Sequence, residues 1–297
     1  KERFLSLPVP VASLDQQRRI VEKLEDHLSH LDAAVNYLAL AARRCDHLIE
    51  SWLRKELQPT ASEVLRLGDV LVDSRGGWSR SRHHLVAPGT GTPYLKMNNI
   101  DRRGVLVLDE IVHVDAEPAD LAKYAIRSGD VLFNSKNSGD LIGKTAVADE
   151  RIAGWVFNEN IMRLRFGELV LSEFAGLWFL SAQARQQITQ SASASTNVAA
   201  VYYRSLREFD IWVPALDTQA RLAAEHREIR GEVDRVKVEL ARQTRRSVAL
   251  RRSLLAAAFS GRLTGANSAL DRALDQVEPA PEAIAGCLRS GACTTMS

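Results

Sequence analysis

Basic and amide residues gather on predicted loops between residues 75 and 204. The densest stretch, RGGWSRSR at 75–82, combines arginines with two glycines that would let the backbone approach a ligand closely. Arg and Lys side chains bind phosphates or guanine edges, and Asn can pair with two atoms of an adenine edge. These residue types therefore favour a surface that binds DNA phosphates and recognises base edges. The candidate contact residues are Arg75, Trp78, Arg80, Arg82, Lys96, Asn98, Asn99, Lys136, Asn137, Lys144, Ser195, Thr196, Asn197, Tyr203 and Arg204.

Each of these segments also fits a simpler interpretation when it is taken alone. The 75–82 stretch has the composition of a solvated loop, Asn98 and Asn99 suit the close of a turn, and residues 191–197 suit a flexible connection. The prediction of a DNA-reading surface therefore rests on the whole set and on the architecture around it.

Residues that could carry catalysis do not form a recognisable centre. The segment GDLIGKT at 139–145 is similar to a P-loop, but its first glycine is one residue too close and a strand is expected after it. The sequence has no Asn-Pro-Pro-aromatic motif of an amino-methyltransferase, and its carboxylates are scattered rather than clustered around a metal. We predict no catalytic residue, no metal site and no cofactor in this chain.

The composition is that of an ordinary globular protein. Of the 297 residues 45% are hydrophobic, and no apolar run reaches the roughly 18 residues that a membrane span needs. Cys45, Cys287 and Cys293 are not spaced with histidines as metal ligands usually are. A net charge of +2 does not decide for nucleic acid, because phosphate binding needs a local basic surface. We expect a cytoplasmic protein with reduced thiols and no membrane contact.

Two similar segments, about 200 residues apart, organise the chain. The first copy reads Leu7-Pro8-Val9-Pro10 and then Leu14-Asp15-x-Gln17-x-Arg19-Ile20, and the second reads Ile211-Trp212-Val213-Pro214 and then Leu216-Asp217-x-Gln219-x-Arg221-Leu222. Each copy predicts a short strand closed by proline and then a helix start. Ser13 with Gln16 fits a capping box, and Asp217 is a candidate cap for the second helix.

Each copy continues into a long helix pattern with apolar residues at alternating spacings of three and four. The seams are Leu24, Leu28, Leu31, Val35, Leu38, Ala42, Cys45, Ile49 and Trp52, and Ile229, Val233, Val236, Leu240, Leu250, Leu254 and Ala257, with Gln243 and Ser247 as interruptions. A helix over 14–57 would be about 65 Å long, since each residue adds about 1.5 Å. We predict that the helices pair antiparallel. Separate packing of each helix on the globular part fits such long seams less well.

The residues between the helices lose this pattern and predict a separate globular domain. Strands are expected at 105–108, 111–114, 131–133, 155–157 and 161–166, and a helix at 172–190 that buries Phe174, Leu177, Trp178 and Ile188. The predicted class is α+β, with a mixed β-sheet and packed helices in one domain and an antiparallel coiled coil of two long helices. The predicted segments are a first helix at 13–57, a linker at 58–65, the domain at 66–213, a second helix at 214–263 and a disordered tail at 264–297.

This order of elements resembles the specificity subunits of type I restriction-modification systems. Leu67-Gly68-Asp69-Val70 resembles the opening of a target recognition domain, and residues 128–134 with 143–146 resemble its middle. Ala258-Phe259-Ser260-Gly261-Arg262-Leu263 resembles the closing motif of the second helix. The resemblance covers residues 5 to about 265.

The resemblance implies a non-catalytic subunit that directs a methyltransferase and restriction complex to a bipartite target in double-stranded DNA. The globular domain would read one half-site, and the helices would set the spacing and dock the methyltransferase (M) subunits. The M subunit would bind S-adenosylmethionine, and the restriction (R) subunit would join for cleavage.

The family usually has two target recognition domains, whereas one is found in this sequence. Residues 1–12 resemble the tail of a first domain, so we expect either part of a longer protein or a half-subunit that forms a homodimer. Two other classes stay open. The recognition part of a fused methyltransferase-nuclease would differ only outside residues 1–297, and a coiled-coil scaffold with a protein-binding domain would have no salt-dependent DNA affinity.

Overall fold

The structure is a computed structural model that describes residues 11–58, 64–194, 199–260 and 262–263. The chain divides into two compact units, one over Asp46–Asp234 and one that combines Lys1–Cys45 with Arg235–Ser297. The predictions for residues 1–10, linker residues 59–63, Ser195, Thr196, Asn197, the Arg82 side chain and the 264–297 tail lie outside this description.

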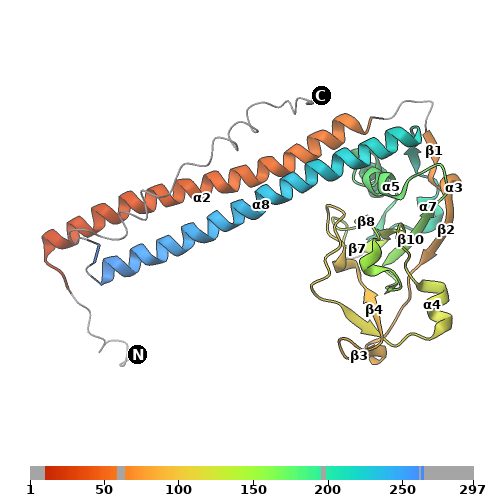
Figure 1. The fold of residues 1–297 in the computed structure, drawn as a ribbon, viewed down its shortest axis with the longest axis horizontal. Helices are drawn as coiled ribbons and strands as arrows, with labels where there is room; N and C mark the ends of the chain where they lie inside the picture. The colour runs from red at the N-terminus through yellow and green to blue at the C-terminus, as the bar shows by residue number, and fades with distance from the viewer. Residues whose placement is uncertain (1–10, 59–63, 195–198, 261, 264–297) are drawn as a thin grey trace. The chain divides into compact units, whose positions relative to one another are not determined.

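Two long helices, α2 (Leu14–Glu56) and α8 (Leu216–Phe259), begin within the two copies of the repeat, at Leu14 and Leu216 (Figure 1). At the start of α2 the predicted capping box is confirmed. Ser13 N donates to Gln16 Oε1 at 3.2 Å, and Gln16 N donates to Ser13 Oγ at 3.4 Å. Asp217 lies inside the first turn of α8, where its carboxylate accepts from Thr218 N at 2.7 Å, so it is not the residue before the helix.

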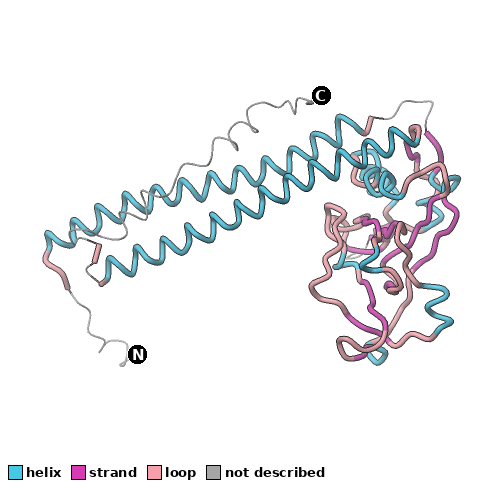
Figure 2. The backbone as a smooth tube through the Cα atoms, viewed as in Figure 1, coloured by secondary structure: helices cyan, strands magenta, loops and turns pink. Residues whose placement is uncertain are grey.

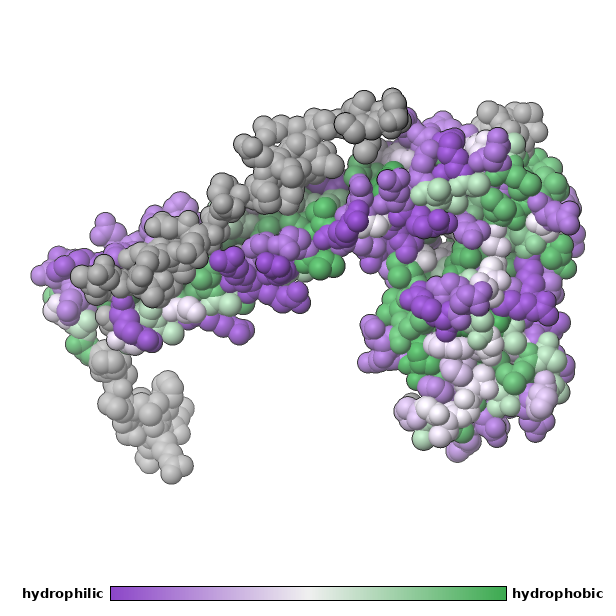
Figure 3. Space-filling view, viewed as in Figure 1, coloured by the Kyte–Doolittle hydropathy of each residue, from purple (hydrophilic) through white to green (hydrophobic). Residues whose placement is uncertain are grey.

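In the smaller unit, α2 and α8 pack along the predicted seams as an antiparallel pair. Leu31 is buried with Leu254, Ala257 and Ala258, and Ile20 and Leu24 pack against the same cluster. The pair also carries an ion pair in which Arg251 Nη1 lies 2.5 Å from Asp32 Oδ1. The visible outer surface of these helices is largely hydrophilic, with hydrophobic residues interspersed (Figure 3). The heptad prediction is therefore confirmed for this unit.

In the larger unit the same helices belong to the core of the globular domain. Trp52 of α2 packs against His226 of α8 with ring centroids 5.6 Å apart and planes tilted by 31°, and Leu57 and Leu222 are buried in the main core cluster. The compact unit therefore extends beyond the predicted domain limits of 66–213 at both ends.

The elements between the two helices are short (Figure 2). In chain order they are β1 (Val64–Arg66), α3 (Leu67–Val70), β2 (Leu71–Gly76), η2 (Arg82–His84), β3 (Leu85–Val86), β4 (Thr92–Leu95), η3 (Met97–Asn99), β5 (Val112–Val114), α4 (Pro118–Tyr124), β6 (Val131–Asn134), β7 (Lys136–Asn137), β8 (Thr145–Val147), η4 (Glu150–Ile152), β9 (Val156–Phe157), β10 (Ile161–Phe166), α5 (Ser172–Trp178), α6 (Ala182–Ser191), β11 (Ser193–Ala194), β12 (Ala199–Ala200), α7 (Tyr203–Leu206) and β13 (Asp210–Trp212).

The strands of the larger unit form antiparallel and mixed sheets, as expected for the predicted α+β class. The central sheet has the antiparallel order β2-β10-β6-β8, and a second has the order β3-β5-β4-β9 with β4 and β9 parallel. Two smaller sheets have the orders β11-β12-β7 and β1-β13. Strand β6 is buried on both faces, because Val131 and Phe133 join one apolar cluster and Leu132 joins another.

Two element predictions differ from the structure. Residues 105–108 do not form the expected strand, and an isolated bridge joins Leu106 to Ile100. The helix expected at 172–190 is divided into α5 and α6, because the Ser181 hydroxyl accepts from Ala184 N at 3.1 Å and caps a new helix. The predicted burial of Phe174, Leu177, Trp178 and Ile188 is confirmed. No helix in the described part of the chain is both long and apolar enough to cross a membrane.

Candidate nucleic-acid interface

The turn at 158–160, between β9 and β10, brings three of the predicted segments together. Asn158 N donates to Leu95 O at 3.0 Å, and the residue before it, Phe157, accepts from Trp78 N at 2.8 Å. The carbonyl oxygen of Asn160 accepts from Ser135 N at 2.8 Å. Backbone bonds therefore hold the segments around 78, 96 and 136 beside one turn, although they are far apart in the sequence.

A fourth segment joins the same place through the sheet β11-β12-β7. Ala199 and Ala200 of β12 pair with Asn137 and Lys136 of β7, and Val201 N donates to Ser135 O at 2.9 Å. Tyr203 and Arg204 follow directly in α7, and both are exposed. The predicted residues Ser195, Thr196 and Asn197 lie between β11 and β12, outside the described residues.

In the 75–82 segment the structure separates exposed from buried candidates. Arg75 is exposed on β2, whereas Trp78 is only 9% exposed and stacks on Tyr124 with ring centroids 5.6 Å apart. The Arg80 guanidinium lies 3.3 Å from the Trp78 ring centroid and 3.2 Å from the Asp120 carboxylate. The Trp78 ring is therefore enclosed by protein, and its DNA contact stays a prediction.

Asn99 is also enclosed by protein, and its predicted base contact stays a prediction. Its side chain is 3% exposed, its Oδ1 accepts from Lys96 N at 2.9 Å, and its Nδ2 donates to the carbonyl oxygens of Val107 and Glu110. The amide is therefore used to shape its own loop. Asn98 is exposed and Lys96 is partly exposed, so both keep the accessibility that the DNA prediction needs.

Lys144 connects two of the loops rather than facing solvent. It is 6% exposed, its Nζ donates to the carbonyl oxygen of Met97 at 2.6 Å, and burial holds its pKa below the usual value. This bond packs two loops together, and the DNA contact of Lys144 stays a prediction. Asn137 Nδ2 donates to Asn134 Oδ1 at 2.7 Å, and Lys136 and Asn137 are both partly exposed.

Sequence reasoning missed an exposed ion pair beside these loops. Arg102 Nη2 lies 2.5 Å from Asp140 Oδ2, and both side chains are more than half exposed. The Ser138 hydroxyl donates to Asp140 Oδ1 at 3.1 Å, and this bond, with Arg102, holds the pKa of Asp140 below its usual value. The pair joins segments 38 residues apart, so the only sequence signal was the local Asp101-Arg102-Arg103 cluster.

A partly buried ion-pair network joins strands β2 and β10. Arg163 of β10 is 4% exposed, and its Nη2 lies 2.7 Å from Asp73 Oδ2 of β2. The neighbouring Arg165 Nε lies 2.6 Å from Asp130 Oδ1. Burial alone would raise the pKa of Asp73, but the bond and charge of Arg163, with Arg165, outweigh it and hold that pKa below the usual value. The network fixes β2 to β10, and both of its carboxylates are engaged by arginines.

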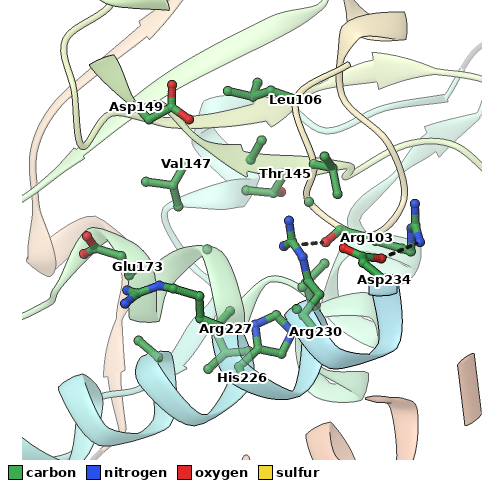
Figure 4. Close-up of a pocket in the computed structure, with 18 of the residues that line it drawn as sticks. Arg103, Leu106, Thr145, Val147, Asp149, Glu173, His226, Arg227, Arg230 and Asp234 are labelled. Atoms are coloured by element: carbon green, nitrogen blue, oxygen red, sulfur yellow. Dashed lines mark hydrogen bonds and ion pairs between the residues drawn. The ribbon is translucent and has the colours of Figure 1, made fainter. Parts of the chain in front are cut away.

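A groove lies where the 103–106 loop and β8 face α8 (Figure 4). Arg103 Nη1 lies 3.5 Å from Asp234 Oδ1, and Arg230 Nη1 donates to Arg103 O at 3.5 Å. His226 lines the groove, and burial and then the charge of Arg230 lower its pKa to about 4. Among the described residues, no group of three or more His, Cys, Asp or Glu side chains is placed to hold a metal ion. The Arg103–Asp234 ion pair and the Arg230 hydrogen bond attach the 103–106 loop to α8.

Comparison with known proteins identifies a family that matches the domain and relatives that align with most of the chain. Residues 59–224 match the family described as Type I restriction modification DNA specificity domain. The chain is 21% identical over 276 residues to the type I restriction enzyme EcoKI specificity subunit of Escherichia coli (strain K12). It is 23% identical over 278 residues to the StySPI specificity subunit of Salmonella potsdam. Each alignment covers 88% of this chain and 59% or 58% of the relative, so the chain spans about three fifths of their length.

Two solved structures share the fold. A chain from the work described as "Structural basis underlying complex assembly and conformational transition of the type I R-M system" matches with a TM-score of 0.68 and 22% identity, over 86% of this chain and 62% of that one. The HsdS subunit from Thermoanaerobacter tengcongensis matches with a TM-score of 0.50 and 21% identity, over 86% of this chain and 60% of that one.

Proposed function

Because the chain belongs to the type I restriction modification DNA specificity domain family, we propose that it reads one half of a bipartite target in double-stranded DNA. Family membership identifies a specificity component rather than an enzyme, in agreement with the sequence prediction. The observation that carries the proposal is the convergence of four segments around the 158–160 turn. They bear Arg75, then Lys96 with Asn98, then Lys136, and finally Arg204.

The residues of this interface divide by burial into two roles. Exposed Arg75, Arg204 and partly exposed Lys96 would bind phosphates and set the register of the domain on the duplex. Exposed Asn98 can pair with an adenine edge in the major groove. The buried side chains of Asn99 and Lys144 would hold the loops in the shape that reading requires.

The long helices would serve the rest of the complex. A paired α2 and α8 would keep this domain at a fixed distance from a second reading domain, supplied by a longer protein or by a second copy in a homodimer. The helices would also dock M subunits, which would bind S-adenosylmethionine and methylate the target, while an R subunit would cleave. The chain would act in the cytoplasm, where this DNA lies.

A domain exchange tests this division of labour. Residues 66–210 would be replaced by the corresponding domain of another specificity subunit, and the product would be co-expressed with M subunits. We expect a different methylated sequence and an unchanged complex on size exclusion. Loss of assembly would show that the domain, and not the helices, docks the M subunits. Absence of any salt-dependent binding of the unaltered chain to duplex DNA would instead favour a protein-binding scaffold.

A further inference from the structure

Four side chains near the 75–82 segment form a closed circuit of contacts. The rings of Trp78 and Tyr124 are nearly parallel, at 8°, with centroids 5.6 Å apart. The Arg80 guanidinium lies 3.3 Å from the Trp78 ring centroid, and its Nη2 lies 3.2 Å from Asp120 Oδ2. Asp120 and Tyr124 are one turn apart on the same helix, α4, so the circuit closes through that helix.

The circuit is attached to the core at two points. The carbonyl oxygen of Ala125, which ends α4, accepts from Nη1 of the buried Arg163 at 2.9 Å. On the other side, the hydroxyl of the buried Tyr94 donates to the carbonyl oxygen of Trp78. Helix α4 and the backbone at Trp78 are therefore both fixed to the sheets, and Arg80 joins them through its side chain.

The surroundings of Arg80 differ from those of an arginine that is ready to bind phosphate. Its side chain is 20% exposed, against an exposed Arg75 in the same segment. Its Nε is buried, and within the described residues it has no hydrogen-bond partner. Its charge is already opposed by the Asp120 carboxylate and the face of the Trp78 ring. Binding to phosphate would require the guanidinium to leave both.

We propose that Arg80 is a positioning residue for DNA reading, which holds the 75–82 segment against α4 through Trp78 and Asp120 without contacting DNA itself. This inference rests on the proposed function, because it assigns roles within the same interface. It makes Asp120, an acidic residue, a requirement for recognition of a polyanion. A simple charge argument predicts the opposite effect, namely tighter DNA binding when the Asp120 carboxylate is removed, because loss of an acid makes the protein more attractive to phosphate.

The test uses the full chain and duplex DNA that the unaltered chain has selected from a random-sequence pool, with a scrambled duplex of equal length as the second probe. Dissociation constants for both duplexes are measured over a series of salt concentrations for Arg80→Lys, Arg80→Ala, Asp120→Asn and Arg75→Ala. Thermal melting of each variant checks that it is folded. Arg75→Ala is the matched control, because it removes the same charge from the same segment outside the circuit.

We expect Arg80→Lys and Asp120→Asn to reduce the preference for the selected duplex about tenfold while binding to the scrambled duplex is retained. Arg75→Ala should weaken binding to both duplexes and reduce the salt slope by about 1, as loss of one phosphate contact does. Arg80→Ala should leave that slope unchanged.

Three results would overturn the proposal. They are full preference for the selected duplex in Arg80→Lys, tighter binding of the selected duplex by Asp120→Asn, and a slope reduced by about 1 in Arg80→Ala. An unaltered chain that does not distinguish the two duplexes would contradict the proposed function itself, and the positioning role with it.

Discussion

Gln219 Nε2 donates a 2.9 Å hydrogen bond to the carbonyl oxygen of Leu169, and the Gln219 side-chain oxygen accepts one of 2.9 Å from Leu171 N. The same Nε2 donates to the carbonyl oxygen of Pro214 at 2.7 Å. Gln219 is fully buried, so these bonds attach the start of α8 to the segment after β10. In the other copy of the repeat, the equivalent Gln17 is exposed and donates to Ala12 O at 2.8 Å.

Gln219→Ala should destabilise the domain by about 2 to 3 kcal/mol, because three backbone groups lose their partner and a cavity forms in the core. Gln17→Ala is the matched control and should change the free energy of unfolding by less than about 0.5 kcal/mol. Urea unfolding followed by circular dichroism measures both. Equal losses in the two variants would contradict the role assigned to Gln219.

Gly77→Ala should disrupt the interface, because a Cβ at this position would lie 1.9 Å from the carbonyl oxygen of Asn158. The 158–160 turn and the 75–82 segment would have to separate, at a cost of about 2 kcal/mol or more in stability. At Gly76 a Cβ would meet nothing within 4 Å, so Gly76→Ala should be tolerated. Melting temperature and binding to selected duplex DNA should fall in the first variant only. Normal DNA binding by a folded Gly77→Ala protein would show that this close approach is not needed.

His226 should make the domain less stable in mild acid. Its pKa is about 4 in the folded chain, against 6.5 as the ordinary value, so the unfolded chain takes up a proton first as the pH falls. The stabilisation is complete above about pH 6.5 and is lost towards pH 4, with a total of about 3 kcal/mol. His226→Leu, which introduces the residue found at the equivalent position 24, should remove this pH-dependent part. Urea unfolding at about pH 7.5 and pH 5 measures it, and parallel pH profiles for both proteins would contradict the assignment.

The elements that sequence analysis predicted best are those set by local pattern. The heptad seams predicted α2 and α8, because long apolar periodicity determines which face of a helix is buried. Strand β10 was predicted over its full length, 161–166, whereas the single predicted helix at 172–190 was wrong because Ser181 was not recognised as a cap. A single serine is a weak signal against a continuous apolar pattern.

The interface was less predictable, because burial there is decided by contacts between distant segments. Composition treats Asn98 and Asn99 as equivalent, but the structure exposes the first and encloses the second among loop carbonyls. The 158–160 turn, which joins the loops, was not predicted at all. Its bonds are made by backbone groups, and these leave no mark on residue type.

The most direct test of the central claim is a map of DNA methylation that depends on this chain. The chain would be co-expressed with candidate methyltransferase (M) subunits in a host without DNA methylation, and modified bases would be located by single-molecule sequencing. The account predicts one bipartite sequence motif that is modified only when the chain is present, and a palindromic motif would indicate two copies of this domain. A stable complex that methylates no defined motif, or one that methylates the same motif without this chain, would contradict the claim that these loops read DNA sequence.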